Sequence, residues 1–172
     1  MKSLLRGLVL VAMMVGAVCF VGIEVLILYQ LGGQVLPYVS RSADEFAGYC
    51  MVASAFLALA YTFAADEHIR VSLVLDRVRP SVRRILERIA VALSVPLTGY
   101  LAWYITKLAW QSWQFDERSA GIIALPLWIP QAAMAFGAIV FFLVVSERAW
   151  WVWRGGEGGL HFRTEETLRA DR

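Results

Sequence analysis

The stretch Asp66–Arg84, with the sequence DEHIRVSLVLDRVRPSVRR, decides how the rest of the chain is arranged. It lies between two long apolar runs and contains one of the two histidines. It also contains a cluster of arginines: Arg70, Arg77, Arg79, Arg83 and Arg84. Basic residues in short loops between membrane spans collect on the cytoplasmic side, whereas acidic residues influence orientation little. We therefore place this segment in the cytoplasm, and that placement orients every other span.

The overall composition is that of a membrane protein. Hydrophobic residues make up 59% of the chain and charged residues 17%, whereas soluble domains are about 45–50% apolar and about 25% charged. A net charge of +2 is too small to indicate a nucleic-acid-binding surface. Cys19 and Cys50 lie in apolar runs without CxxC spacing. We interpret them as small buried hydrophobic residues rather than as a disulfide or redox pair.

Four apolar runs are each long enough to cross the hydrocarbon core, which takes about 20 helical residues. They cover residues 8–31, 46–65, 85–110 and 127–147. The first is predicted to be an uncleaved span, because it is longer than the apolar part of a signal peptide and no A-x-A-like cleavage site follows it. Gly32-Gly33 is predicted to end this span. Pro96 is predicted to kink the third.

The distribution of basic residues predicts the topology. The inner segments hold Lys2, Arg6, the five loop arginines, Arg88 and the arginines from Arg148 onward, and the outer segments hold Arg41, Lys107 and Arg118. This asymmetry predicts an all-α integral membrane protein with four transmembrane helices and both termini in the cytoplasm. Residues 1–153 would form the membrane domain and residues 154–172 a flexible cytoplasmic tail.

A short amphipathic helix is predicted in the inner interface between spans 2 and 3. Apolar side chains recur there at helical spacing while charged residues occupy the other sides. The apolar positions are Val71, Val74, Leu75 and Val78. Pro80 is predicted to close this helix and to open the third span.

Glu24 lies well inside the first span. An ionisable group at membrane depth costs about 2.5–3.5 kcal/mol on insertion scales and normally faces protein or water. Glu24 is either part of a proton or ion relay, or a carboxyl group that is protonated or paired with a partner subunit. The second interpretation is favoured because no second intramembrane carboxylate or lysine accompanies it. Glu24 is therefore predicted to mark a helix face turned away from lipid.

The second span begins with negative charge and continues with small residues. Asp44 and Glu45 fall in its first turn, where the helix dipole favours them, and Ser42 or Asp44 can cap it. Small residues let helices approach closely in lipid, so we expect this span to be the most protein-enclosed. All seven tryptophans lie at the predicted interfaces and are candidate membrane anchors: Trp103, Trp110, Trp113, Trp128, Trp150, Trp151 and Trp153.

The sequence contains no pattern that indicates catalysis or cofactor binding. A haem b in a four-helix membrane protein needs paired axial histidines inside the bundle, but His68 and His161 lie at the interface and in the tail. Nucleophilic triads, HExxH and phosphate-binding loops are missing. We therefore predict no enzyme, no catalytic, substrate-binding or metal site and no cofactor. His68 is interpreted as an interfacial hydrogen-bonding or packing residue.

Three motifs in this order carry a family resemblance. They are Asp44-Glu45-Phe46 at the start of the second span, AADEHIRV at residues 64–71 at its end, and LPLWIP at residues 125–130 before the fourth span. Together with the four spans they resemble the small, Q-type (DctQ-like) membrane subunit of TRAP (tripartite ATP-independent periplasmic) transporters. The chain departs from the family pattern at Tyr29-Gln30, where members often carry an Arg-Tyr pair, and at Ser72, where Asp is common.

The resemblance implies a heterocomplex in the inner membrane of a bacterium or archaeon. A large multi-span membrane subunit would hold the substrate and sodium sites and move in an elevator-like way. A periplasmic substrate-binding protein would deliver an organic acid such as a dicarboxylate or sialic acid. The small subunit would be a scaffold that anchors the large subunit among membrane lipids.

The resemblance also suggests residues for folding, interface anchoring and docking to the large subunit: Glu24, Asp44, Glu45, His68 and Arg70. The alternative for the last four is that they only cap helices and hold them at the lipid headgroups. Two other functions stay open. One is a membrane anchor or assembly subunit of an unrelated redox complex, which bound haem or quinone would indicate. The other is a self-contained channel or exporter with a homo-oligomeric pore lined by Glu24.

Overall fold

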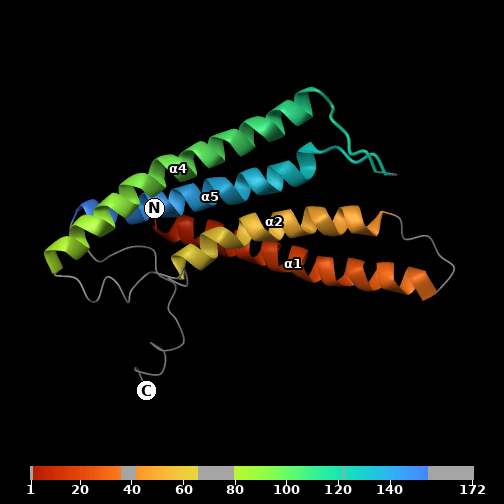
Figure 1. The fold of residues 1–172 in the computed structure, drawn as a ribbon, viewed down its shortest axis with the longest axis horizontal. Helices are drawn as coiled ribbons and strands as arrows, with labels where there is room; N and C mark the ends of the chain where they lie inside the picture. The colour runs from red at the N-terminus through yellow and green to blue at the C-terminus, as the bar shows by residue number, and fades with distance from the viewer. Residues whose placement is uncertain (1, 36–41, 66–79, 122, 155–172) are drawn as a thin grey trace, which may run out of the picture.

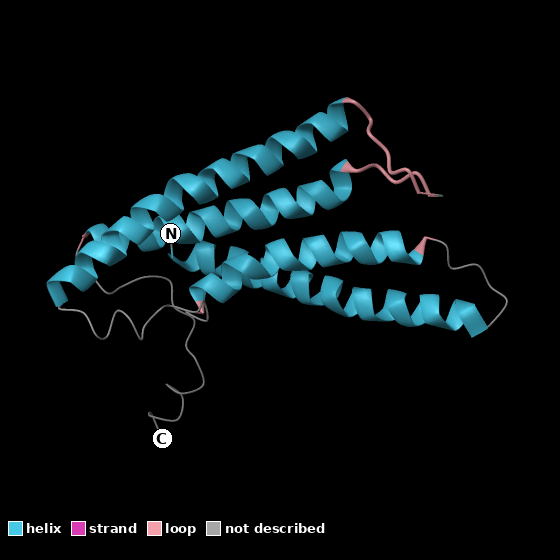
Figure 2. Cartoon of the chain, viewed as in Figure 1, coloured by secondary structure: helices cyan, strands magenta, loops and turns pink. Residues whose placement is uncertain are grey.

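The computed structural model describes residues 2–35, 42–65, 80–121 and 123–154, and these residues are helical apart from turns and one isolated β-bridge (Figures 1 and 2). The helices are α1 (Lys2–Val35), α2 (Ala43–Ala64), α4 (Pro80–Gln114) and α5 (Trp128–Trp153). All four are long and apolar enough to cross a membrane. The predicted all-α fold with four spans is therefore confirmed. The predicted interfacial helix and the tail from residue 155 onward lie outside the described ranges.

Two helix boundaries differ from those predicted. The apolar span ends at Gly33, as predicted, but the glycines do not end the helix, because α1 continues through both of them to Val35. Glycine weakens a helix by only about 1 kcal/mol relative to alanine, so two glycines near its end do not by themselves stop it. Helix α4 has 35 residues and begins at Pro80, where the third span was predicted to open. It runs through Pro96 without interruption and ends at Gln114, beyond the predicted end at residue 110.

The start of α2 agrees in part with the prediction. Asp44 and Glu45 both lie in its first turn. Ser42 occupies the position before the helix, but its side chain makes no capping hydrogen bond. Its carbonyl oxygen accepts a bond from the Phe46 amide at 3.3 Å instead.

The helices form a row rather than a closed bundle. α1 packs along α2, α2 along α5, and α5 along α4, while α1 touches α5 over a smaller area. Figure 1 shows this order, with α4 and α1 at the two edges. α2 therefore shares the central position with α5 and is not alone in being enclosed by other helices.

Small side chains make the contacts inside the row. Near the N-terminal end of α1, three helices meet in one cluster of buried residues: Val9, Ala60, Ala64, Val140 and Val144. Between α4 and α5 the buried residues are Ala102, Ile105, Ala135 and Ala138. Close packing of small residues is what holds helices together in lipid, where burial of apolar surface supplies no driving force.

Two helices approach each other closely at Gly137. A Cβ atom placed on this glycine of α5 would lie 2.6 Å from the backbone carbonyl carbon of Phe56 in α2. That distance is shorter than real contacts allow, and helix backbone cannot move aside as a side chain can. Gly137 thus fixes how closely the two central helices pack.

We predict that Gly137→Ala lowers stability by about 1–3 kcal/mol, because the added methyl group overpacks the α2–α5 contact. Gly48→Ala is the matched control, since a Cβ there would meet no atom within 4 Å. In an open helical position the same change stabilises by about 0.5–1 kcal/mol. The thermal unfolding midpoint in detergent should therefore fall for Gly137→Ala and stay or rise for Gly48→Ala. Equal midpoints would contradict the close approach.

Candidate docking and anchoring surfaces

The α4 helix ends in a defined C-cap that turns the chain toward α5. Asp116 has a φ of 48°, in the left-handed region. Its amide donates to the Trp113 carbonyl at 3.4 Å, and the Glu117 amide donates to the Ser112 carbonyl at 3.0 Å. This pair of bonds is the Schellman motif. Aspartate occupies the position that glycine usually takes, and the side chain forms an ion pair with Arg118 at 3.0 Å.

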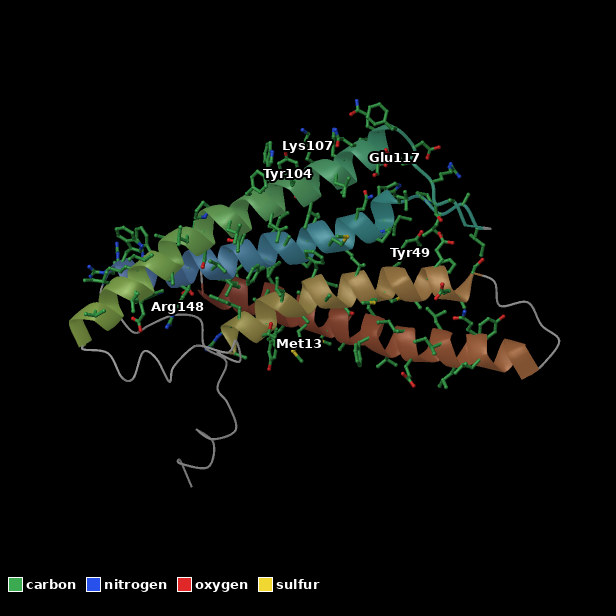
Figure 3. All side chains as sticks on the ribbon, viewed as in Figure 1. Met13, Tyr49, Tyr104, Lys107, Glu117 and Arg148 are labelled. Carbon is green, nitrogen blue, oxygen red and sulfur yellow. The ribbon has the colours of Figure 1, made fainter. Side chains whose placement is uncertain are left out.

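The 115–127 loop, which joins α4 to α5, folds back on itself. The Ser119 amide donates to the Leu125 carbonyl at 2.9 Å, and the Leu127 amide donates to the Glu117 carbonyl at 3.0 Å. The hydroxyl of Ser112, which is fully buried, donates to the Glu117 carboxylate at 2.6 Å. Backbone and side-chain bonds thus attach the loop to the last turn of α4. Figure 3 labels Glu117 at this end of α4.

The same loop also contacts the first turns of α2 through a group of polar residues, here called the Glu45 cluster: Glu45, Tyr49, Ser119 and Gly121. The Tyr49 hydroxyl donates to the Glu45 carboxylate at 2.6 Å. Ser119 lies beside the Tyr49 hydroxyl, and its side-chain oxygen accepts a bond from the Gly121 amide at 3.0 Å. A Cβ atom on Gly121 would collide with the Glu45 carboxylate, so glycine permits this contact. The cluster links the α4–α5 hairpin to α2.

Glu24 lies elsewhere, on α1. Its residue is exposed in the isolated chain, and no polar partner for its carboxylate is found in the described ranges. The helix face next to it is apolar, with Val21 and Leu28 both exposed. The structure therefore does not bring Glu24 together with Asp44 or Glu45, and the relay interpretation gains no partner within the described residues.

Aromatic side chains mark the edge of the row formed by α4. The Tyr100 and Tyr104 ring centroids lie 4.6 Å apart, and those of Trp110 and Trp113 lie 5.0 Å apart. The Lys107 ammonium lies 5.9 Å from the Tyr104 ring. Figure 3 shows Tyr104 and Lys107 pointing away from α5. Amphipathic rings beside a basic group suit the lipid headgroup region.

A second aromatic group lies at the end of α5. The Trp151 indole donates to the Glu147 carboxylate at 3.0 Å. The Arg154 guanidinium lies 4.3 Å from the Trp150 ring centroid, which is a cation–π contact. Among the predicted anchors, all but Trp151 are exposed: Trp103, Trp110, Trp113, Trp128, Trp150 and Trp153.

The predicted site residues have different outcomes. Glu45 takes part in the Glu45 cluster, while Asp44 is exposed beside it in the first turn of α2. His68 and Arg70 lie outside the described residues. Sequence reasoning missed Tyr49, although its spacing of four residues from Glu45 was a usable signal. It also missed Ser112 and Gly121, whose partners depend on how the loop folds back.

Within the described ranges, no group of three or more potential metal-ligating side chains is found. The family model described as "Tripartite ATP-independent periplasmic transporters, DctQ component" matches residues 23–155, which is most of the chain. No curated protein and no solved structure matches the chain.

We predict that Ser112→Ala loosens the 115–127 loop, because the buried donor to the Glu117 carboxylate is lost. A hydrogen bond to a charged group contributes about 1.5–3 kcal/mol, so tryptic cleavage after Arg118 should speed up roughly ten-fold or more. Ser94→Ala is the control, since its hydroxyl bonds only the Ala90 carbonyl of its own helix. Fragment masses after brief digestion measure the effect. Similar rates for both variants would show that the Ser112–Glu117 bond does not hold the loop.

Proposed function

The chain belongs to the DctQ component family of tripartite ATP-independent periplasmic transporters, and on that premise we propose that this small permease subunit is a scaffold that transports nothing by itself. It would anchor a large multi-span membrane subunit in the bilayer. A periplasmic substrate-binding protein would complete the transporter. The observation that carries the proposal is the arrangement of the four described helices in an open row, with α1 and α4 at its edges.

The buried polar groups support this role. A transport site needs polar groups gathered near the bilayer midplane, usually on interrupted helices. Here the described helices are continuous, and the buried hydroxyls of Ser54 and Thr98 bond carbonyls of their own helices. Two buried side-chain oxygens of α5, on Gln131 and Ser146, have no partner within the described residues. They lie fifteen positions apart, about 22 Å along the helix, and so do not form one site.

The finer features of the proposal come from the family and the charge pattern. We place the 115–127 loop on the periplasmic side and both chain termini in the cytoplasm of a bacterial or archaeal cell, with residues 1–153 as the membrane domain and 154–172 as a tail. The complete transporter would couple sodium entry to uptake of an organic acid, for example a dicarboxylate or sialic acid.

The predicted polar residues receive roles within this arrangement. Asp44 and Glu45 would support the fold and help to dock the subunit on the periplasmic side, with Glu45 fixing the 115–127 loop on α2. His68 and Arg70 would do the same at the cytoplasmic interface. The exposed tryptophans of α4 and α5 would hold the row at the two lipid headgroup regions.

We predict that the tagged chain, extracted from its native membrane in nanodiscs, retains a stoichiometric partner with many membrane spans. The chain reconstituted alone into vesicles should transport no organic acid, because its described residues enclose no pathway. Mass spectrometry identifies the partner, and uptake of labelled dicarboxylates and sialic acid measures transport. Vesicles that hold the complete complex and the binding protein are the positive control.

Three results would contradict the scaffold role. Sodium-driven uptake by the isolated chain would place the transport site in this subunit. A homo-oligomer without a partner would favour a channel or exporter. Haem or quinone bound to the purified chain would favour a redox-complex anchor, and an absorption spectrum detects the haem.

A further inference from the structure

The face of α1 that no other helix covers carries a regular stripe, here called the α1 seam: Leu10, Met14, Ala17, Val21, Glu24, Leu28 and Leu31. The spacing alternates between four and three residues, and every member is exposed in this chain. Alternating spacing of this kind lines up side chains along one side of a helix for packing against a second helix. We propose that the α1 seam packs against a transmembrane helix of the large subunit, which presents a hydrogen-bond donor to Glu24.

The depth of Glu24 supports a protein partner. Gly22 of α1 packs against Cys50 of α2, and a Cβ atom placed on this glycine would lie 3.6 Å from the thiol sulfur. Cys50 lies seven residues after the start of α2. Because α1 runs antiparallel to α2, Glu24, two residues after Gly22, lies closer to that start. At about 1.5 Å per residue, Glu24 is level with a point about 8 Å inside the N-terminal end of α2. An ionisable side chain at such depth normally faces protein or water. In the isolated chain the residue is exposed, and no partner for its carboxylate lies within the described ranges.

The two edges of the row differ in chemistry. The α4 edge carries exposed Trp103, Tyr104, Lys107 and Trp110, which are side chains suited to the lipid headgroups. The α1 edge has no tryptophan in all of Lys2–Val35, and besides the exposed Phe20 and Tyr29 it carries the Glu24 carboxylate. We therefore assign the α4 edge to lipid and the α1 edge to protein.

A second copy of this chain fits the α1 seam poorly. Two copies in one membrane share the same orientation, so a twofold contact through the seam would bring Glu24 against Glu24 at equal depth. Two carboxylates at short distance in a low-dielectric medium repel strongly, so one of them would have to bind a proton before this contact could form. A helix of the large subunit, whose sequence is independent, can supply a hydroxyl, amide or basic group. This inference rests on the proposed function, because it names that subunit as the occupant.

Photo-cross-linking tests the assignment in the complete complex. A benzophenone amino acid is placed at Val21 or Leu28 in the α1 seam, and at Leu97 on α4 as the control. Their exposed fractions are similar, at 62%, 59% and 71%. Irradiation in native membranes should join the seam positions, and not position 97, to the large subunit. Mass spectrometry identifies the adduct.

The other outcomes separate the two proposals. Suppose that the large subunit still co-purifies. The inference is then overturned by adducts from position 97 alone, by adducts between two copies of this chain, or by the lack of any protein adduct from the seam. Each of these results leaves the scaffold function standing. Failure of any large subunit to co-purify would overturn the proposed function and the inference with it.

The carboxylate is tested by Glu24→Leu, with Val18→Leu as the control because Val18 is exposed on α1 but lies outside the seam. Loss of the bond to a donor should reduce the large subunit retained per chain by about ten-fold. Val18→Leu should leave retention unchanged. The assignment of Glu24 is wrong if the Glu24→Leu chain retains as much large subunit as the wild type. It is also wrong if Val18→Leu loses as much large subunit as Glu24→Leu.

Discussion

The close contact of α2 and α5 at Gly137 holds the two helical hairpins of this protein in one row. α1 and α2 form one hairpin and α4 and α5 the other, and the main contact between them runs along the two central helices. The Phe56 carbonyl lies so close to Gly137 that only glycine fits. In lipid such backbone proximity replaces the apolar burial that would join helices in water.

Two further contacts hold the hairpins at opposite ends of this pair. Near Val9, side chains of α1, α2 and α5 form one buried cluster. At the other end the 115–127 loop reaches from α4 back to Glu45 and Tyr49 of α2. The loop can do this because the Schellman turn at Asp116 and the Ser112–Glu117 bond fix its direction. A row tied in this way resists sliding of one hairpin along the other.

The elements of the fold could be predicted from sequence because each depends on local composition. Twenty or so apolar residues predict a membrane helix wherever they occur, and the acidic first turn of α2 follows the helix dipole. The order of the helices in the row depends instead on the contact between Gly137 and Phe56. These residues are far apart in the sequence, and no local pattern predicts that they meet. Glu45 could be predicted as a candidate residue because its place in the first turn of α2 is a local feature. Its contacts with Gly121 and the loop could not, because they depend on how distant segments meet.

Hydropathy cannot distinguish a helix face that meets lipid from one that meets another membrane protein, because both surroundings are equally apolar. The distinction must come from the few polar and aromatic side chains on each face. On α4 these are rings and a lysine, whose polar ends need the headgroup region. On α1, besides the exposed Tyr29, it is the Glu24 carboxylate, which needs a donor. The scaffold role that we propose requires this asymmetry, since a row with two identical edges would bind its partner on either side.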